Sequence, residues 1–384
     1  MPILWFAIFF ATAALLTALV NWVGLIPWRR AAEAHWTERA RLLYPVRFTA
    51  ALDIFMLPIL LVEIGFLWAP RDFPMFLMMT IAGCCGALVG GYPMSREIYP
   101  QLDFRCWGHQ VVAGWAMPFL IMAALITACC AMPPTVDGKM LLITGGYLAF
   151  HGLLQYGLVL KYLRLVRFLK PASPRLRQIV DEALLRISAR VRHTWQLGGV
   201  LANAIAFPTT RELIFSDRLL EICTDAEISA VCAHELAHLT ESKAVLAGRL
   251  FGSLTFFPLI FISPAVQYCG PIGLVLPYAG MFLILHFARR LSQRMEKRAD
   301  QAALAEQSDE GVYAKALEKL YQANQTPAVN VNNRQTHPHL YDRMLAAGIT
   351  PDYPRPARPK RMTWPGWLIV AGFGAMLAFR LFRF

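Results

Sequence analysis

Hydrophobic positions in this chain gather into long uninterrupted runs, and two long polar stretches separate them. Eight runs approach the length of about 20 residues that an α-helix needs to cross the hydrocarbon core of a membrane. They cover residues 3–27, 48–69, 75–92, 111–132, 140–160, 250–268, 270–287 and 364–382. The pattern predicts five spans, then a polar stretch, a hairpin of two spans, a second polar stretch and a final span.

These runs predict how the chain is divided. We expect five transmembrane spans in residues 1–160 and the two halves of a polar domain in residues 161–249 and 288–363. A transmembrane hairpin, residues 250–287, splits that domain, and residues 364–384 form the last span. The expected architecture is therefore an all-α membrane protein of about eight spans with one folded domain outside the bilayer.

The polar domain contains both strand and helix signals. Residues 201–207 (LANAIAF) and 212–216 (ELIFS) have strand-like apolar character on either side of a Pro-Thr-Thr turn, which predicts a hairpin. A helix should follow, because Thr224 and Glu227 have the spacing of a capping box. Its buried face would consist of Ile228, Val231, Cys232 and Leu236. These signals predict an α+β domain.

Composition agrees with a membrane protein. The 384 residues are 57% hydrophobic and 16% charged, and the mean hydropathy is +0.43. Such values are too apolar for a soluble protein of this length.

The net charge of +12 is unevenly distributed. Basic residues cluster after the first and fifth predicted spans, whereas the loops on the opposite side carry only Arg71 and Lys139. By the positive-inside rule, the amino terminus lies outside and both polar stretches face the cytoplasm. No aromatic platform accompanies the charge, so a nucleic-acid partner is not expected, whereas the lipid bilayer is.

The sequence HELAH, residues 234–238, lies inside the predicted helix. His234 and His238 are four residues apart, which places both rings on one helix face, where they can reach the same ion. Glu235 would project beside that ion, where a carboxylate can take a proton from water. A surface position for both histidines on an amphipathic helix is the alternative.

A hydrolytic zinc site needs a third protein ligand. Glu241 follows His238 by three residues, and three ligands on one straight helix cannot enclose an ion. The next carboxylates are Glu296 and Asp300, which share a helix face beyond the hairpin. Two membrane crossings return the chain to the side of His238, so a shared site is possible. Surface ion pairs with neighbouring basic residues remain the alternative for these two carboxylates.

Four elements, in order, resemble the integral-membrane zinc metalloproteases of the CAAX prenyl protease and HtpX type. They are NAIA (203–206), the helix approach with HELAH (218–239), the S-x-R-x-E-x-x-A-D element (292–300) and THPHLYDR (336–343). The resemblance runs from about residue 203 to 343. Gln293 replaces a basic residue of the family pattern and His339 replaces a proline, and the number of spans also differs.

The resemblance implies a zincin-like domain that binds one Zn²⁺ per chain. His234, His238 and Glu296 would be the ligands, and Glu235 the general base. Asp300 would accept a hydrogen bond from a ligand imidazole and fix its tautomer. Further roles would fall to His337 and Arg343, as oxyanion stabilisers or cleft residues, and to Asn203, Ala204 and Ala206, as an edge strand that pairs with the substrate backbone.

The expected function is therefore a zinc-dependent endopeptidase that hydrolyses peptides or membrane proteins at the cytoplasmic face, with a bacterial inner membrane as the expected location. One alternative is a non-catalytic membrane scaffold or receptor derived from such a protease. Another is a transporter, which would require broken helices meeting at mid-membrane near Glu63.

Overall fold

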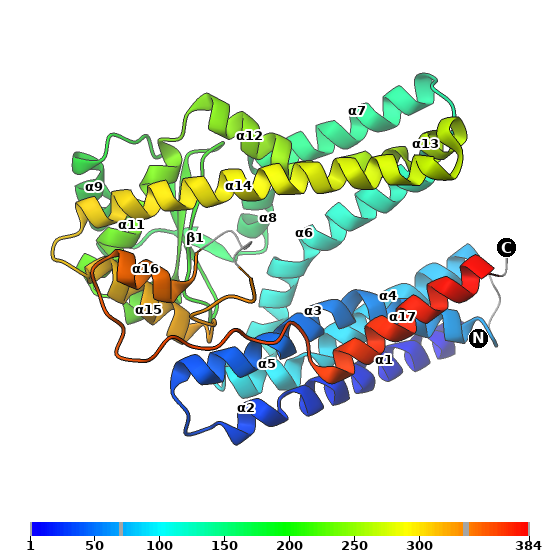
Figure 1. Cartoon of the computed structure of the whole chain (residues 1–384), viewed down its shortest axis with the longest axis horizontal. Coiled ribbons are helices and arrows are strands. Elements are labelled where there is room, and N and C mark those ends of the chain that lie inside the picture. The colour runs from blue at the N-terminus through cyan, green and yellow to red at the C-terminus, as the bar shows by residue number, and fades with distance from the viewer. Residues whose placement is uncertain (1, 69–71, 333–337, 383–384) are drawn as a thin grey trace. The chain divides into compact units, whose positions relative to one another are not determined.

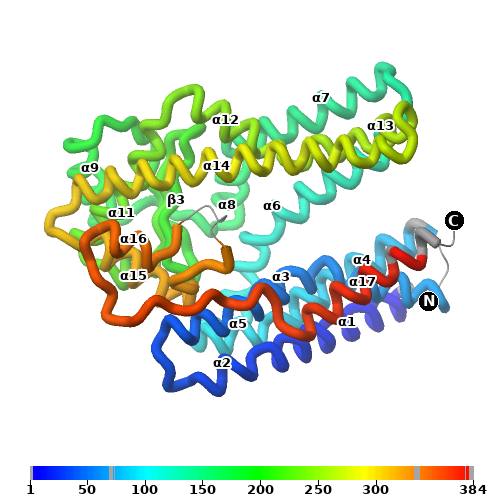
Figure 2. The backbone as a smooth tube through the Cα atoms, in the orientation of Figure 1, coloured from blue at the N-terminus to red at the C-terminus, as the bar shows by residue number. Residues whose placement is uncertain are grey.

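The computed structural model describes residues 2–68, 72–332 and 338–382 and divides the chain into two compact units. The first unit comprises residues 1–108, 321–332 and 351–384, and the second comprises residues 109–320 and 333–350. The order of elements can be followed by colour in Figures 1 and 2.

The first unit is helical. Its elements are α1 (Pro2–Gly24), α2 (Ile26–Arg30), α3 (Trp36–Gly65), α4 (Phe73–Gly90), α5 (Tyr92–Ile98) and α17 (Trp364–Phe382). Helix α1 packs against α3, α4 and α17, and these helices run side by side in Figure 1. Helix α3 is continuous through Glu63, so it lacks the break that a transporter site at this carboxylate would require.

Two glycines bring α1 and α4 close together. A Cβ atom on Gly86 would lie 2.2 Å from the carbonyl oxygen of Phe10, and one on Gly90 would lie 2.3 Å from that of Ala14. Glycines four residues apart form a flat seam on one helix face, the pattern that permits close packing between membrane helices. The backbone of α1 therefore rests directly on this seam.

The second unit combines membrane-type helices with an α+β domain. It contains most of α6 (Phe104–Ala131), then α7 (Gly138–Leu153), the π-helical turn η1 (Leu154–Leu158) and α8 (Val159–Leu165). After the sheet region come α12 (Lys243–Ser253), η2 (Phe257–Phe261), α13 (Ile262–Cys269), η3 (Gly270–Leu274) and α14 (Val275–Glu306). Helices α15 (Val312–Ala323), of which residues 312–320 belong to this unit, and α16 (Leu340–Ala346) follow.

Within the described residues, five helices are long and apolar enough to cross a membrane. They span Ile3–Arg30, Trp36–Gly65, Pro74–Ile98, Phe104–Ala131 and Phe257–Glu306, and Trp364–Met376 is a shorter apolar helix. The chain is thus a membrane protein by the length and composition of its helices. Three predicted spans are not among these five. The run at 140–160 is interrupted by the π-helical turn, the runs at 250–268 and 270–287 fall largely within the single segment Phe257–Glu306, and the last run forms the shorter helix.

A four-stranded sheet forms the centre of the α+β domain. Its strands are β1 (Leu169–Pro171), β2 (His193–Leu197), β3 (Ala204–Phe207) and β4 (Glu212–Ser216), in the spatial order β1-β2-β4-β3. The predicted hairpin is confirmed, since β3 pairs antiparallel with β4. Strand β2 runs parallel to β4, and β1 runs antiparallel to β2.

Helices cover this sheet. Helix α11 (Asp225–Leu239) contacts β3, α9 (Pro174–Arg186) and α14, while the short α10 (Asp217–Ile222) leads into it from β4. Leu213, Phe215, Ile228 and Leu236 are almost completely buried. Helix α14 is a single 32-residue helix that begins at the apolar turn and ends beside α11 (Figure 1). One rigid element therefore links the membrane-type segment to the domain.

Candidate metal centre

Helix α11 presents HELAH at its carboxyl-terminal end. Its start is fixed by the predicted capping box: the Glu227 N–H donates to Thr224 Oγ1 (3.3 Å), and the Thr224 N–H donates to Glu227 Oε2 (2.8 Å). The predicted stripe of Ile228, Val231 and other apolar residues is buried, which fixes the rotation of the helix. The histidines consequently point into the domain.

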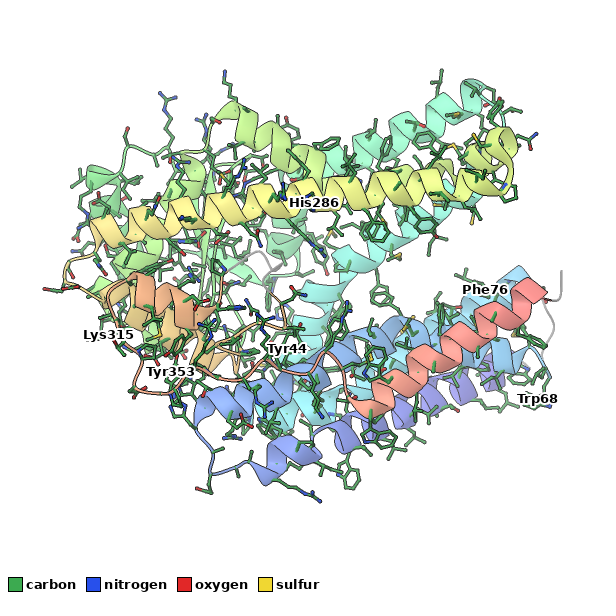
Figure 3. All side chains as sticks on the ribbon, in the orientation of Figure 1. Tyr44, Trp68, Phe76, His286, Lys315 and Tyr353 are labelled. Carbon is green, nitrogen blue, oxygen red and sulfur yellow. The ribbon has the colours of Figure 1, made fainter. Side chains whose placement is uncertain are left out.

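Glu296 reaches both histidines from α14. Its Oε2 lies 3.5 Å from His234 Nε2, and its Oε1 lies 3.6 Å from His238 Nε2. One donor atom from each of the three residues lies within 4.8 Å of the others. The three residues are 6–8% exposed. In Figure 3, His286 marks the middle of α14, and Glu296 follows ten residues later on the same helix.

The donor set fits a zinc ion. Two imidazole nitrogens and one carboxylate are a common ligand set of catalytic zinc, which keeps a fourth position open. Burial of three polar groups this close together also costs free energy of desolvation, unless they share a cation or a proton. The arrangement therefore suits a divalent metal, and sequence reasoning had brought the same three residues together.

Behind His234, three polar side chains form a network. Tyr313 Oη lies 2.7 Å from His234 Nδ1 and donates to Asp300 Oδ1 (2.8 Å). Asp300 Oδ1 lies 3.2 Å from the same Nδ1. Arg343 donates from Nε to Asp300 Oδ2 (2.9 Å) and from Nη2 to Tyr313 Oη (2.9 Å). Asp300 thus occupies the place expected of a residue that orients His234.

The sequence did not indicate Tyr313. It lies on α15 and is 2% exposed, whereas Lys315, two residues later, projects into solvent (Figure 3). A buried tyrosine needs a partner for its hydroxyl, but only the tertiary packing of α15 shows that this partner is His234.

A second network lies behind His238. Helix α11 ends at Leu239, so Glu241 is outside the helix and its side chain turns back. Glu241 Oε1 lies 2.9 Å from His238 Nδ1. Arg249, on α12, donates from Nε to Glu241 Oε2 (2.7 Å) and from Nη2 to Oε1 (2.5 Å). The assumption that Glu241 continues the straight helix is therefore wrong, and its contact with His238 was missed.

The charges around His234 favour its protonated form. Burial lowers the pKa of His234, but hydrogen bonds with Asp300 and Glu296 and the nearby charge of Glu235 outweigh burial and raise it to about 9. Burial raises the pKa of Tyr313 well above its ordinary value, so its hydroxyl remains a donor. A metal that binds here has to displace a proton from His234.

The pKa of Glu241 shifts in the opposite direction to that of His234. Burial raises its pKa, but hydrogen bonds from His238 and Arg249 outweigh burial, and the net shift is downward. Glu241 is therefore an ionised acceptor.

The remaining predicted site residues that the structure describes lie on or beside several elements of the second unit. Glu235 is on α11 and 8% exposed. Strand β3, with Ala204 and Ala206, is an edge strand that pairs only with β4 among the described strands and contacts α11. Asn203 precedes it, and its N–H donates to Ser216 Oγ (2.8 Å). Arg343 faces Asp300 and Tyr313, and His337 lies outside the described residues.

Comparison with known families gives one match. Residues 172–348 match the model of Peptidase family M48. The matched region begins just before α9, ends just after α16 and contains every residue of the two networks described above. A comparison with curated proteins found no match.

Proposed function

We propose that this membrane protein, whose residues 172–348 form a Peptidase family M48 domain, is a zinc-dependent endopeptidase that cleaves membrane proteins or membrane-associated peptides. The observation that carries the proposal is the meeting of His234, His238 and Glu296, buried donors from two helices that a run of apolar helices separates in the chain. A surface role for these groups would not bury all three.

Zinc would be held by His234 Nε2, His238 Nε2 and the Glu296 carboxylate, and when bound it would supply Lewis acidity toward a peptide carbonyl and a water molecule. Glu235 follows His234 directly on α11, and we assign its carboxylate as the general base on that position in the sequence. It takes a proton from the attacking water and passes it to the departing amine nitrogen. Together these steps break the peptide bond by hydrolysis.

Positioning residues complete this assignment. Asp300 and Tyr313 hold His234 through Nδ1, which keeps Nε2 directed at the metal position. Arg343 binds Asp300 with two nitrogens, so we assign it to holding Asp300. A direct role for Arg343 at the oxyanion, and any role for His337, remain predictions from the family resemblance.

Strand β3 is the proposed substrate-binding element. An edge strand offers backbone N–H and C=O groups to an extended peptide, which would add to the sheet as a further strand. Because β3 contacts α11, a peptide paired beside Ala204 and Ala206 lies next to the helix that carries Glu235. Asn203 would fix the start of the strand through its bonds with Ser216.

The distribution of basic residues supports an assignment of the side of the membrane. Under the positive-inside rule, the basic stretch after residue 160 favours a cytoplasmic M48 domain and an amino terminus outside. The predicted division at residues 160, 249, 287 and 363 and the count of about eight spans belong to this proposal. We further propose the subgroup of the CAAX prenyl protease and HtpX type, a bacterial inner membrane as the location, and one zinc ion per chain.

Metal removal tests the proposal. The full-length protein, purified in detergent, should contain about one zinc per chain and cleave casein or an apolar membrane peptide. A chelator should abolish cleavage, and added Zn²⁺ should restore it. Stoichiometric zinc without cleavage of any peptide would favour the non-catalytic scaffold, and protein without zinc would refute the metal centre.

A further inference from the structure

The two metal-facing histidines have matching surroundings. Each Nδ1 atom lies against a carboxylate, and each carboxylate is bound by two nitrogens of an arginine. For His234 the carboxylate is Asp300, and for His238 it is Glu241. The family resemblance accounts for Asp300 but not for Glu241.

We propose that Glu241, held by Arg249, sets the tautomer of His238 that binds the metal, and is therefore a positioning residue of the metal centre. The inference rests on the proposed function, because it concerns the same metal site.

Local backbone geometry places Glu241 for this role. The chain turns after Leu239, where Thr240 closes the helix through its N–H (3.2 Å) and its Oγ1 (2.9 Å), both donating to the carbonyl of Ala237. The Glu241 side chain is then 2% exposed, whereas that of Arg249 is 30% exposed. A carboxylate this deeply buried is stable only when paired, and Arg249 provides the pairing.

The tautomer of His238 follows from what lies beside its two ring nitrogens, the metal position at Nε2 and Glu241 at Nδ1. A neutral imidazole carries one proton, and the nitrogen that binds a metal cannot carry it. His238 Nε2 faces the metal position, so the proton belongs on Nδ1. Glu241 Oε1, at 2.9 Å, can only accept a hydrogen bond and therefore selects this tautomer. The bound metal would gain from a more basic ring.

Arg249 has the opposite preference. Its Nη2 lies 3.2 Å from the same Nδ1 and can only donate, which would favour a proton on Nε2 and block metal binding. In the intact site Glu241 is nearer to Nδ1 and occupies two nitrogens of Arg249. The carboxylate therefore decides the tautomer, and Arg249 acts only through it.

This competition predicts an uncommon pattern of mutational effects. Loss of Glu241 alone leaves the guanidinium of Arg249 beside Nδ1, where it favours the wrong tautomer and adds positive charge near the metal. Loss of both Glu241 and Arg249 removes the guanidinium from Nδ1, so that metal binding at Nε2 alone determines the tautomer of His238. If Glu241 and Arg249 served only to pack the end of α11, the double variant would be the weaker binder.

The test measures Zn²⁺ dissociation constants by competition with a chelator, and the visible absorption of bound Co²⁺, on full-length protein in detergent. The variants are Glu241→Ala, Glu241→Gln, Arg249→Ala and the double variant Glu241→Ala/Arg249→Ala. Glu221→Ala is the matched control, since Glu221 forms an exposed ion pair with Arg218. Absorption of Co²⁺ reports ligand geometry independently of catalysis.

We expect Glu241→Ala to weaken Zn²⁺ binding about 10–100-fold and to change the Co²⁺ spectrum. The double variant should bind Zn²⁺ about two-fold more tightly than Glu241→Ala, or tighter still, because contacting residues have coupling energies of this size. Its Co²⁺ spectrum should be closer to that of the wild type. Glu241→Gln keeps an oxygen acceptor and should fall between Glu241→Ala and wild type.

Two results would overturn the inference alone: wild-type affinity in Glu241→Ala, or weaker binding by the double variant than by Glu241→Ala. Absence of metal binding in both wild type and Glu221→Ala would overturn the proposed function itself, and this inference with it.

Discussion

Asp300 and Arg343 are joined by two hydrogen bonds, from Nε to Oδ2 at 2.9 Å and from Nη2 to Oδ1 at 2.5 Å. The arginine side chain is 7% exposed and the carboxylate side chain 15%. A pair buried this deeply fixes the direction of the carboxylate, and the Asp300 Oδ1 atom that contacts His234 is one of the two oxygens held.

This relationship gives the first prediction. Asp300→Ala should weaken metal affinity or activity about 10–100-fold, the range found when a partner of a ligand histidine is removed. Arg343→Ala should have an effect of the same sign, because the freed carboxylate no longer holds one orientation. Asp309→Ala, in an exposed loop, serves as control. Unchanged zinc affinity in Asp300→Ala, measured with a competing chelator, would mean that Asp300 has only a structural role in its ion pair with Arg343.

Glu296 provides the second prediction. Glu296→Ala should lose stoichiometric zinc, since two histidines alone leave the ion poorly enclosed. Glu306→Ala is a matched control on the same helix, because the contact of Glu306 with Arg186, at 3.6 Å, is partly exposed. Elemental analysis of the purified proteins distinguishes them. A full zinc content in Glu296→Ala would mean that the third ligand is a different residue.

The third prediction concerns the glycine seam of the first unit. Gly86→Ala places a methyl group against the backbone oxygen of Phe10, which cannot move aside as a side chain can. Overpacking of this kind costs about 1–3 kcal/mol, so the thermal unfolding midpoint should fall. Gly374→Ala, where a Cβ atom meets nothing within 4 Å, should leave the midpoint unchanged. Equal midpoints for both variants would contradict the close contact between α1 and α4.

The fourth prediction tests the side of the membrane. In a background without the eight native cysteines, Thr135→Cys should react with an impermeant thiol reagent in intact cells. Arg177→Cys should react only after lysis, because the proposed topology has the basic stretch in the cytoplasm. Both positions are exposed on the protein surface, so a difference in labelling reports the side of the membrane on which each position lies. Labelling of Arg177→Cys in intact cells would reverse the proposed topology.

Local signals predicted the parts of the site that local chemistry controls. The capping box of Thr224 and Glu227, the hairpin of β3 and β4 and the buried stripe from Ile228 to Leu236 are all present in the structure. Strands β1 and β2 were not predicted, because segments of three and five residues with mixed polarity have no clear period. Their pairing depends on contacts distant in the chain.

The same limit explains the missed site residues. Tyr313 reaches His234 only through the packing of α15, which no spacing in the sequence encodes. From the sequence, Glu241 is excluded as a third ligand, because three ligands on one straight helix cannot enclose an ion. The helix ends two residues earlier, and the turn at Thr240 directs Glu241 back to His238. The position at which α11 ends therefore determines which groups Glu241 contacts.

The most direct test of the account is peptide cleavage by Glu235→Gln compared with wild type, at equal measured zinc content. The amide keeps the shape of the side chain but cannot take a proton from water, so folding and zinc binding should persist while cleavage falls about 10²–10⁴-fold. The variant should still retain a bound substrate peptide, because β3 and the metal ligands are unaltered. Full cleavage by zinc-loaded Glu235→Gln would contradict the assignment of Glu235 as the base and the mechanism built on it.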